Sequence, residues 1–209
     1  MTGKKRISIV VPAYNESDCI DELGSRLGTV FDGLPQYDFE AIIVENGSQD
    51  DTYEKLLAVR ERDPRFQIVK LARNFNMDGG LTAGLSYATG DAAILMTADL
   101  QDPPEVIPDF IAKWEEGYAH VHGVVTDRVG MGPVRKFNSA LFYFLANKLT
   151  DGRLPRNVSD FRLIDRRIVD TINSMEERNR FMRGLFAWVG YPTTGVEHER
   201  PPRHGGDSK

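Results

Sequence analysis

Oxygen-bearing side chains follow a short apolar run near the middle of the chain. The run covers residues 92–96 and is followed directly by Thr97, Ala98, Asp99, Leu100, Gln101, Asp102, Pro103 and Pro104. A buried strand that ends at carboxylate and amide oxygens places them at the edge of a sheet. Asp99 and Gln101 are two residues apart, so a fully extended strand would direct both side chains to one face, and the alternative is that the chain already turns at this motif. Such ligands suit Mg²⁺ or Mn²⁺, which could there meet a diphosphate. An Asp-rich and Pro-rich loop before a helix explains these residues equally well.

Strands and helices alternate along the part of the chain that must position this segment. Apolar and β-branched runs predict strands at residues 7–11, 39–44, 66–71, 92–98 and 121–125. Helical patterns separate them, including a Gly-rich helix at 79–88 and a helix at 106–114. This alternation implies right-handed crossovers and a mostly parallel sheet flanked by helices, which is the α/β class.

The pattern changes after residue 130. We predict a helix at 133–150, a strand at 161–164, helices at 167–175 and 179–189, and a last strand at 193–198. The helix at 133–150 is rich in aromatic residues. It fits a core-facing role as well as a contact with a membrane surface or another subunit.

Polar residues follow four successive predicted strands. In a parallel sheet the carboxyl ends of the strands form the ligand crevice, so these residues should meet at one edge. Any one of them could be an ordinary cap or turn, but four such strand ends are better explained by a nucleotide-like ligand. The candidates are Tyr14, Asn15, Glu16, Glu45, Asn46, Arg73, Asn74, Thr97, Ala98 and Asp99. The Gly79-Gly80 pair lets a backbone approach phosphate closely, although without a full dinucleotide-binding pattern it is weak evidence for this role.

Length and composition limit the classes of protein to consider. A chain of 209 residues is long enough for one domain with a sizeable core. The single Cys19 excludes an internal disulfide and a cysteine-based metal cluster, which favours a reducing compartment. No apolar run approaches the roughly 18 residues that a membrane-spanning helix requires, so we expect the chain as given to be soluble.

Charge is distributed unevenly along the chain. Residues 1–127 contain 11 Lys and Arg against 22 Asp and Glu, whereas residues 128–209 contain 15 against 9. The net charges of the two parts are therefore −11 and +6, within the overall −5. The C-terminal part is the better candidate to bind an anionic partner, and a solvated basic face is the plain alternative. We expect no nucleic-acid partner.

Four segments form a set that is more specific than any one of its members. They are Val11-Pro12-Ala13-Tyr14-Asn15-Glu16, Val44-Glu45-Asn46-Gly47-Ser48-Gln49-Asp50, Arg73-Asn74-Phe75 and Thr97-Ala98-Asp99-Leu100-Gln101-Asp102-Pro103-Pro104-Glu105. Together they resemble family 2 glycosyltransferases. The similarity is greatest to the dolichol-phosphate-mannose-synthase-like bacterial branch, which glycosylates polyprenyl phosphate. It continues through Asp160-Phe161-Arg162-Leu163, Arg180-Phe181-Met182-Arg183-Gly184-Leu185 and residues 200–209, and so covers nearly the whole chain.

The resemblance implies a Rossmann-like GT-A fold, a UDP- or GDP-sugar donor and inversion at the anomeric carbon. It implies that Asp99 and Gln101 hold Mg²⁺ or Mn²⁺ on the diphosphate, and that Asp160 is a base or a carboxylate that orients the acceptor. The residues that would contact the nucleotide sugar are Pro12, Ala13, Tyr14, Glu16, Glu45, Asn46, Asn74, Gly80, Thr97, Ala98 and Asp99. Those that would face donor and acceptor phosphates are Arg128, Arg135, Arg200, Arg203, Ser208 and Lys209, the last four on a mobile loop. Within a single domain, residues 1–127 would bind the donor and residues 128–209 would form the acceptor side.

The chain departs from the family pattern in three places. The usual Asp-x-Asp is Thr97-Ala98-Asp99, so one carboxylate is missing, which puts metal affinity or sugar preference in doubt. The usual Asp-Asp after the second strand is Glu45-Asn46, which keeps hydrogen bonding but carries one charge less. Most members of the branch continue beyond the Ser-Lys position into membrane-spanning helices, whereas this sequence stops at Lys209. It is either a naturally soluble member or a truncated one.

Three functions are compatible with these features. The one we favour is transfer to a polyprenyl phosphate, which the set of motifs and the net charge of +6 in the C-terminal part indicate. A phosphate monoester has its second pKa near ~6 and needs little help from a base. The second is transfer to a protein or glycan hydroxyl, for which Asp160 is the candidate base. An ordinary ion pair of Asp160 with Arg162 or Arg166 is nearly as good an interpretation of that residue. The third is a nucleotide-sugar-binding protein impaired in catalysis, suggested by Thr97.

The sequence does not identify the sugar or the nucleotide. It leaves the oligomeric state open, a homo-oligomer included. We expect a cytoplasmic location, either free or peripheral at the inner face of the membrane.

Overall fold

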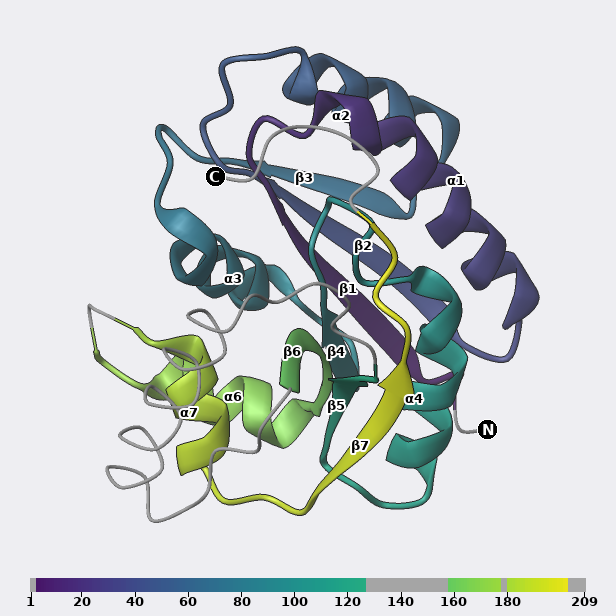
Figure 1. Ribbon diagram of the computed structural model, residues 1–209, viewed down its shortest axis with the longest axis vertical. Coiled ribbons are helices and arrows are strands. Elements are labelled where there is room, and N and C mark those ends of the chain that lie inside the picture. The colour runs from purple at the N-terminus through teal and green to yellow at the C-terminus, as the bar shows by residue number, and fades with distance from the viewer. Residues whose placement is uncertain (1–2, 127–157, 178–179, 203–209) are drawn as a thin grey trace.

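The computed structural model describes residues 3–126, 158–177 and 180–202, which fold around one sheet (Figure 1). In order across the sheet, the strands are β3 (Phe66–Lys70), β2 (Asp38–Glu45), β1 (Arg6–Ala13), β4 (Ala92–Leu95), β6 (Val158–Asp165), β5 (His120–Val125) and β7 (Thr193–His198). The helix predicted at 133–150 lies outside the described residues.

The sheet is mostly parallel, as predicted. β1 pairs in parallel with β2 and β4, β2 with β3, and β5 with β7. β6 lies between β4 and β5 and runs antiparallel to both. The α/β class is therefore confirmed, and the insertion of β6 separates β5 from β4, the strand that precedes it in the chain. Apolar pattern alone could not predict this insertion, because a strand buried on both faces has the same pattern in either direction.

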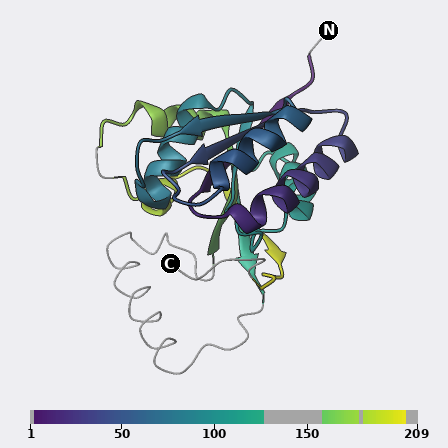
Figure 2. The same cartoon turned by 90° about the horizontal axis from the view of Figure 1, so that it is seen from above.

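Helices cover both faces of the sheet, which gives three layers (Figure 1). On one face lie α1 (Ser17–Gly33), α2 (Thr52–Arg62) and α4 (Ile107–Glu115), the last preceded by the 3-10 turn η1 (Pro104–Val106). On the other face lie α3 (Asn76–Tyr87), α6 (Arg166–Ser174) and α7 (Met182–Trp188). Figure 2 shows α1 and α2 side by side on their face of the sheet.

β1 is central and alternates its side chains between two hydrophobic cores. Ile7, Ile9 and Val11 face the core that contains α1 and α4, whereas Val10 faces the core that contains α3. Residue 84 on α3 is a glycine, and a Cβ there would lie 2.3 Å from Val10 Cγ1. The absence of a side chain at this point lets α3 approach β1 closely. The amino end of α3 is thereby held beside the carboxyl ends of β1 and β2.

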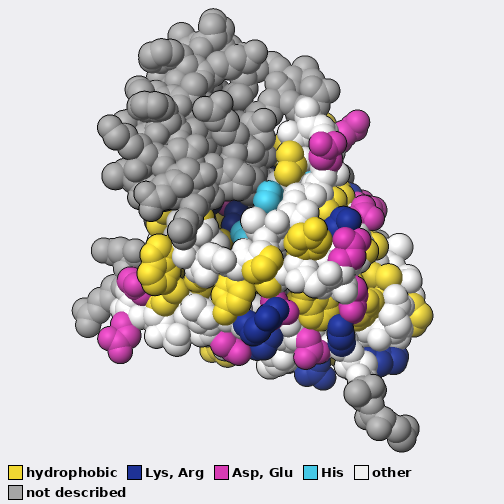
Figure 3. All heavy atoms as spheres, turned by 90° about the horizontal axis from the view of Figure 1, so that it is seen from below, with side chains coloured by type: hydrophobic (Ala, Val, Ile, Leu, Met, Phe, Trp, Pro, Cys, Tyr) yellow, Lys and Arg dark blue, Asp and Glu magenta, His cyan; other side chains and the backbone are white. Residues whose placement is uncertain are grey.

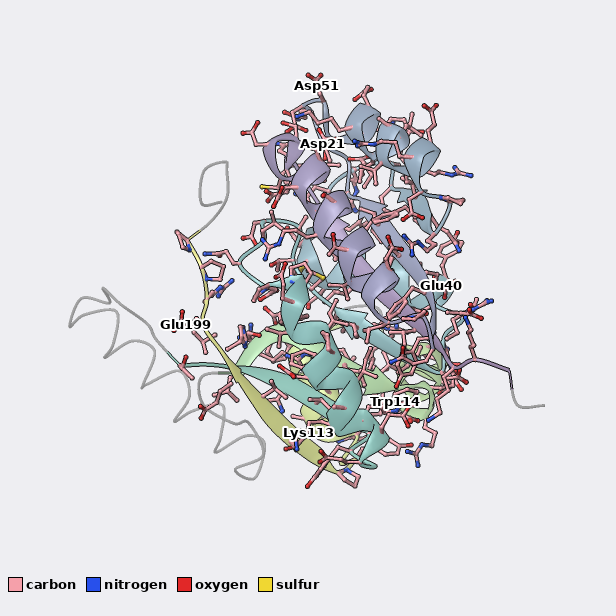
Figure 4. The ribbon with its side chains drawn as sticks, turned by 90° about the vertical axis from the view of Figure 1, so that its right-hand side faces the viewer. Asp21, Glu40, Asp51, Lys113, Trp114 and Glu199 are labelled. Atoms are coloured by element: carbon pink, nitrogen blue, oxygen red, sulfur yellow. The ribbon has the colours of Figure 1, made fainter. Side chains whose placement is uncertain are left out.

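A buried carboxylate organises the amino end of the sheet, away from the predicted site. Glu40 on β2 is 6% exposed, and its Oε1 accepts hydrogen bonds from Ser8 Oγ (2.6 Å), Thr89 N (2.7 Å) and Thr89 Oγ1 (2.9 Å). Figure 4 shows Glu40 far from Glu199, which follows the carboxyl end of β7. Glu40 therefore joins β1, β2 and the loop before β4 without contributing to the opposite edge.

Replacing Glu40 tests this network. Glu40→Ala leaves the buried hydroxyl of Ser8 and the partly buried N–H of Thr89 without their acceptor, which we expect to lower the free energy of unfolding by about 1–3 kcal/mol. Urea denaturation followed by circular dichroism measures the change. Asp38→Ala, at an exposed position on the same strand, should stay within about 0.5 kcal/mol of the parent. Equal effects of the two substitutions would contradict the role of the Glu40 network.

Candidate functional site

The segment after β4 forms a turn. β4 ends at Leu95, and Leu100 has a φ of 61° although it is not a glycine. Such a backbone is strained, and it persists here because the Leu100 side chain is buried in the core at 2% exposure. Asp99 Oδ1 accepts hydrogen bonds from Thr97 Oγ1 at 2.7 Å and Gln101 N at 3.1 Å. The chain therefore turns here, which is the second of the two geometries considered for Asp99 and Gln101, and the turn brings both residues to one cavity.

The cavity has a volume of about 420 Å³ and lies at the carboxyl edge of the sheet. Its walls come from the ends of β1 and β2, the segment between β3 and α3, and the turn after β4. The lining residues predicted from sequence are Pro12, Ala13, Tyr14, Glu16, Asn46, Asn74, Thr97, Ala98, Asp99 and Gln101. The structure therefore brings together residues that lie up to 89 positions apart, numbers 12 and 101.

Two further lining residues, Asn76 and Met77, were not singled out as candidates. Asn76 begins α3 with a φ of 60°, a conformation that asparagine tolerates better than most residues. An asparagine at the junction of a strand end and a helix was the available signal for Asn76. Met77 carried no such signal.

Asn46 is the hydrogen-bonding centre of the cavity wall. Its Oδ1 accepts from Phe75 N at 2.9 Å, its Nδ2 donates to Asn76 O at 3.0 Å, and its backbone N donates to Ala13 O at 2.9 Å. The neighbouring Gly47 has a φ of 74°, and a Cβ there would lie 2.8 Å from the backbone N of residue 74. Asn46, at the end of β2, thus contacts the end of β1 through its backbone N–H and the start of α3 through its side-chain amide.

Glu45 and Gly80 lie behind this wall. Glu45 is 1% exposed, and its Oε1 accepts a hydrogen bond from Ser48 N. Gly80 is buried, and a Cβ there would lie 2.8 Å from Pro12 Cβ. Neither residue lines the cavity. Gly80 instead permits the close packing of α3 against the Pro12 ring.

Asp102 stands beneath the turn at 1% exposure. Its Oδ2 accepts a hydrogen bond from Thr97 N at 3.0 Å and lies 2.8 Å from Thr97 Oγ1, whose one proton can be donated either to Asp102 or to Asp99. Burial raises the pKa of Asp102 to about 6, and the positive charge of Arg200 acts in the opposite direction. Arg200 is thus the predicted phosphate-binding residue that the structure brings near the turn. Arg128, Arg135, Arg203, Ser208 and Lys209 lie outside the described residues.

Asp160 on β6 is held in an ion pair with α7. Arg183 Nε lies 3.0 Å from Asp160 Oδ1, and Arg183 Nη2 lies 2.6 Å from Asp160 Oδ2. The alternative partner Arg162 is farther away, with its Nη2 3.7 Å from Asp160 Oδ1. Arg166 instead donates to backbone carbonyls before β4 and to Asp170. Asp160 does not line the cavity, and sequence reasoning did not identify Arg183 as its partner.

Positive charge lies beneath Asp160. Arg162 is 2% exposed and donates to the backbone carbonyls of Ser159 and Asp160. Burial lowers its pKa to about 10, so it still carries its charge at neutral pH. His122 shares this environment and is 7% exposed, and Figure 3 shows only small patches of histidine on the face seen from below. In the coloured part of that face, Lys and Arg side chains are interspersed with Asp and Glu.

The donor set fits a divalent cation that a ligand completes. Asp99 and Gln101 supply carboxylate and amide oxygens from the same cavity wall. Among the residues that the structure describes, no group of three or more His, Cys, Asp and Glu is arranged to hold a metal ion alone. Mg²⁺ usually takes one or two carboxylates together with waters and substrate phosphates, and does not need a complete protein cage. The residues present therefore fit a cation shared with a diphosphate.

Comparison with known proteins identifies the family. The sequence pattern of Glycosyl transferase family 2 matches residues 8–172, which include every lining residue of the cavity. The chain belongs to glycosyl transferase family 2. The predicted family is thus confirmed, and the segment that it covers extends from β1 to α6.

Relatives of this family 2 chain are similar over almost its whole length. It is 43% identical over 203 residues to an uncharacterized glycosyltransferase of Synechocystis sp., with 97% of this chain covered. It is 40% identical over 204 residues to a prophage bactoprenol glucosyl transferase homolog of Escherichia coli, with 98% covered. The chain spans 64% of the length of the first relative and 66% of the second. Within its described part, no helix has the length and apolar character needed to cross a membrane.

Solved structures of glycosyltransferases share the fold. Glucosyl-3-phosphoglycerate synthase of Mycobacterium tuberculosis superposes with a TM-score of 0.66 at 19% identity, covering 95% of this chain and 73% of that one. A mannosyltransferase of Pyrobaculum calidifontis, solved in complex with GDP-Man and Mn²⁺, gives 0.65 at 16% identity, with 97% and 59% covered. The expected GT-A fold is therefore confirmed.

Acid should destabilise the fold through His122. Burial, followed by the charge of Arg162, lowers the pKa of His122 from 6.5 to about 4. Between these values the unfolded chain binds a proton that the folded chain does not, so stability from this group is present above pH 6.5 and is lost as pH falls to about 4. His122→Asn should reduce the slope of the unfolding free energy over this range by up to about 1.4 kcal/mol per pH unit.

Urea unfolding at a series of pH values measures the slope. Burial also lowers the pKa of His198, which is present in both proteins, so its contribution cancels. The pKa of His120 is lowered first by burial, then by Arg162 and last by His122, so only the last contribution differs between the two proteins. Parallel stability curves for the parent and His122→Asn would show that this histidine is not the origin of the effect.

Proposed function

We propose that this chain is an inverting, metal-dependent glycosyltransferase that moves a sugar from a nucleoside-diphosphate sugar to a polyprenyl phosphate. The observation that carries the proposal is the cavity, in which Asp99 and Gln101 share a wall with residues from three other strand ends. All of its lining residues fall within residues 1–127, the part assigned to the donor. Relatives named bactoprenol glucosyl transferases support a lipid acceptor and make glucose the first sugar to test.

The chain's own residues account for the handling of the donor. Asp99 and Gln101 would hold the cation, and Asn46 fixes the strand ends that would enclose the nucleotide. The cation, when bound, acts as a Lewis acid that neutralises the departing diphosphate. Arg200 adds fixed positive charge near the same turn, where negative charge develops as the sugar leaves. Structural neighbours solved with UDP or with GDP-Man make both nucleotides worth testing.

The state of Asp160 favours a phosphate acceptor over a hydroxyl. Both of its oxygens are engaged by the Arg183 guanidinium, so a proton accepted there would break a bidentate ion pair. A base that removes a hydroxyl proton needs an oxygen available to that proton. A phosphate monoester, with its second pKa near ~6, is already mostly a dianion at neutral pH and has no such requirement. A lipid-linked phosphate would also place the working enzyme at the membrane surface, where we propose a peripheral location.

A transfer assay tests the proposed activity. The protein is incubated with Mn²⁺ or Mg²⁺, a panel of UDP- and GDP-sugars and a polyprenyl phosphate in detergent, and products are identified by mass spectrometry. We expect a sugar-linked polyprenyl phosphate, and we expect Asp99→Asn to reduce turnover by more than the roughly 10–100-fold typical of substitutions around a metal ligand. Asp109→Asn, at an exposed position on α4, is the matched control and should not change turnover. Absence of transfer across the whole panel would contradict the proposal and leave the catalytically impaired alternative.

Asp160 and Arg183 test the choice of acceptor. If the pair acts as a unit, Asp160→Asn and Arg183→Gln should lower kcat by similar factors, and the double variant should add little because the first change already removes the interaction. If Asp160 were a base for a hydroxyl acceptor, its loss alone would cost about 10²–10⁴-fold, and Arg183→Gln would not match it. Steady-state kinetics of the three variants distinguishes these outcomes.

A further inference from the structure

A chain of hydrogen bonds runs from the core to the cavity wall through Thr97. Asp102, buried at 1% exposure, accepts a hydrogen bond from Thr97 N at 3.0 Å, and its Oδ2 lies 2.8 Å from Thr97 Oγ1. Thr97 Oγ1 in turn lies 2.7 Å from Asp99 Oδ1, on the cavity wall. These contacts connect a buried carboxylate to the carboxylate proposed to hold the cation.

The geometry restricts the Asp99 side chain from two sides. Asp102 fixes the backbone of Thr97 through its N–H, which keeps the Thr97 hydroxyl within hydrogen-bond distance of Asp99 Oδ1. The hydroxyl has one proton, which it donates to Asp99 or to Asp102 but not to both at once. Gln101 N, at 3.1 Å, donates to the same Asp99 oxygen as the Thr97 hydroxyl. The strained backbone of Leu100 between them is kept in place by its buried side chain. The Asp99 carboxylate is therefore held in one orientation before any ligand binds.

We infer that Thr97 and Asp102 are positioning residues that orient Asp99 for a divalent cation. The inference rests on the proposed metal-binding role of Asp99. Ligating carboxylates depend on hydrogen bonds from their surroundings, and loss of such a bond typically reduces metal affinity about 10–100-fold. Thr97 supplies a hydrogen-bond donor at a position where the resemblance to family 2 implied a carboxylate, which would supply only acceptors. The substitution thus preserves an oriented ligand instead of disabling the site.

Two pairs of substitutions test the inference. Thr97→Val keeps the shape but removes the hydroxyl, and it should weaken Mn²⁺ binding about 10–100-fold, whereas Thr97→Ser should stay within about 3-fold of the parent. Asp102→Ala removes the oxygen that accepts from Thr97 N and should weaken binding similarly, whereas Asp102→Asn retains an oxygen that accepts from Thr97 N and should preserve it. Thr29→Val, at an exposed position on α1, is the matched control.

The measurement is the electron paramagnetic resonance signal of free Mn²⁺ during titration of the protein, alone and with UDP or GDP. Circular dichroism during heating checks that each variant is folded. Mn²⁺ affinity of Thr97→Val equal to that of the parent would overturn the inference, as would a Thr97→Ser variant as weak as Thr97→Val. Parallel titration of Asp99→Asn separates the two proposals. Undiminished binding by Asp99→Asn refutes its metal role, whereas weak binding by Asp99→Asn with normal binding by Thr97→Val refutes the positioning role alone.

Discussion

The parallel pairing of β1 with β2 and β4 is the constraint on which the site depends. Pro12 and Ala13 at the end of β1 lie opposite Val44 and Glu45 at the end of β2, and Val10 lies opposite Leu95 at the end of β4. Because neighbouring strands are only about 4.8 Å apart, this register places residues distant in the chain within reach of one small ligand. A slip by one residue would reverse the faces of the buried side chains and is prevented by the two cores on either side.

The sequence predicted correctly those features that depend on the residue pattern within a single strand or helix. Apolar runs located the strands, and the rule that parallel strands share a ligand-binding edge predicted that Tyr14, Asn46, Asn74 and Asp99 would meet. It did not predict the features that depend on contacts between distant parts of the chain. The end of β4 at Leu95 depends on a buried Leu100 with positive φ, and the place of β6 between β4 and β5 depends on pairing across the sheet. The partner of Asp160 lies on a helix 23 residues away, a separation for which the sequence offers no periodic signal.

Buried charge is handled differently at the two ends of the sheet. At the amino end, Glu40 accepts hydrogen bonds from a backbone N–H and from two hydroxyls, all of them neutral groups. Its role there is to connect neighbouring segments of the fold. At the carboxyl end, burial raises the pKa of Asp102 while Arg162 remains charged nearby, and the charge of Arg200 reaches the same carboxylate. A site that receives a diphosphate and a phosphate accumulates negative charge, so fixed cations at this end oppose the repulsion that carboxylates alone would cause.

The arrangement of Asp160 also bears on how one fold can serve different acceptors. Arg183 comes from α7, whose first residue, Met182, donates its backbone N–H to Asp78 of α3. Burial raises the pKa of Asp78, and the charges of Asp160 and Arg183 act on it as well. The orientation of Asp160 therefore depends on how α7 is seated against α3. In a relative in which α7 lacked this arginine, the same carboxylate would lose its guanidinium and become available to a hydroxyl proton. If the proposed acceptor is correct, the ion pair, more than the carboxylate itself, is the feature that would distinguish a phosphate acceptor from a hydroxyl acceptor on this fold.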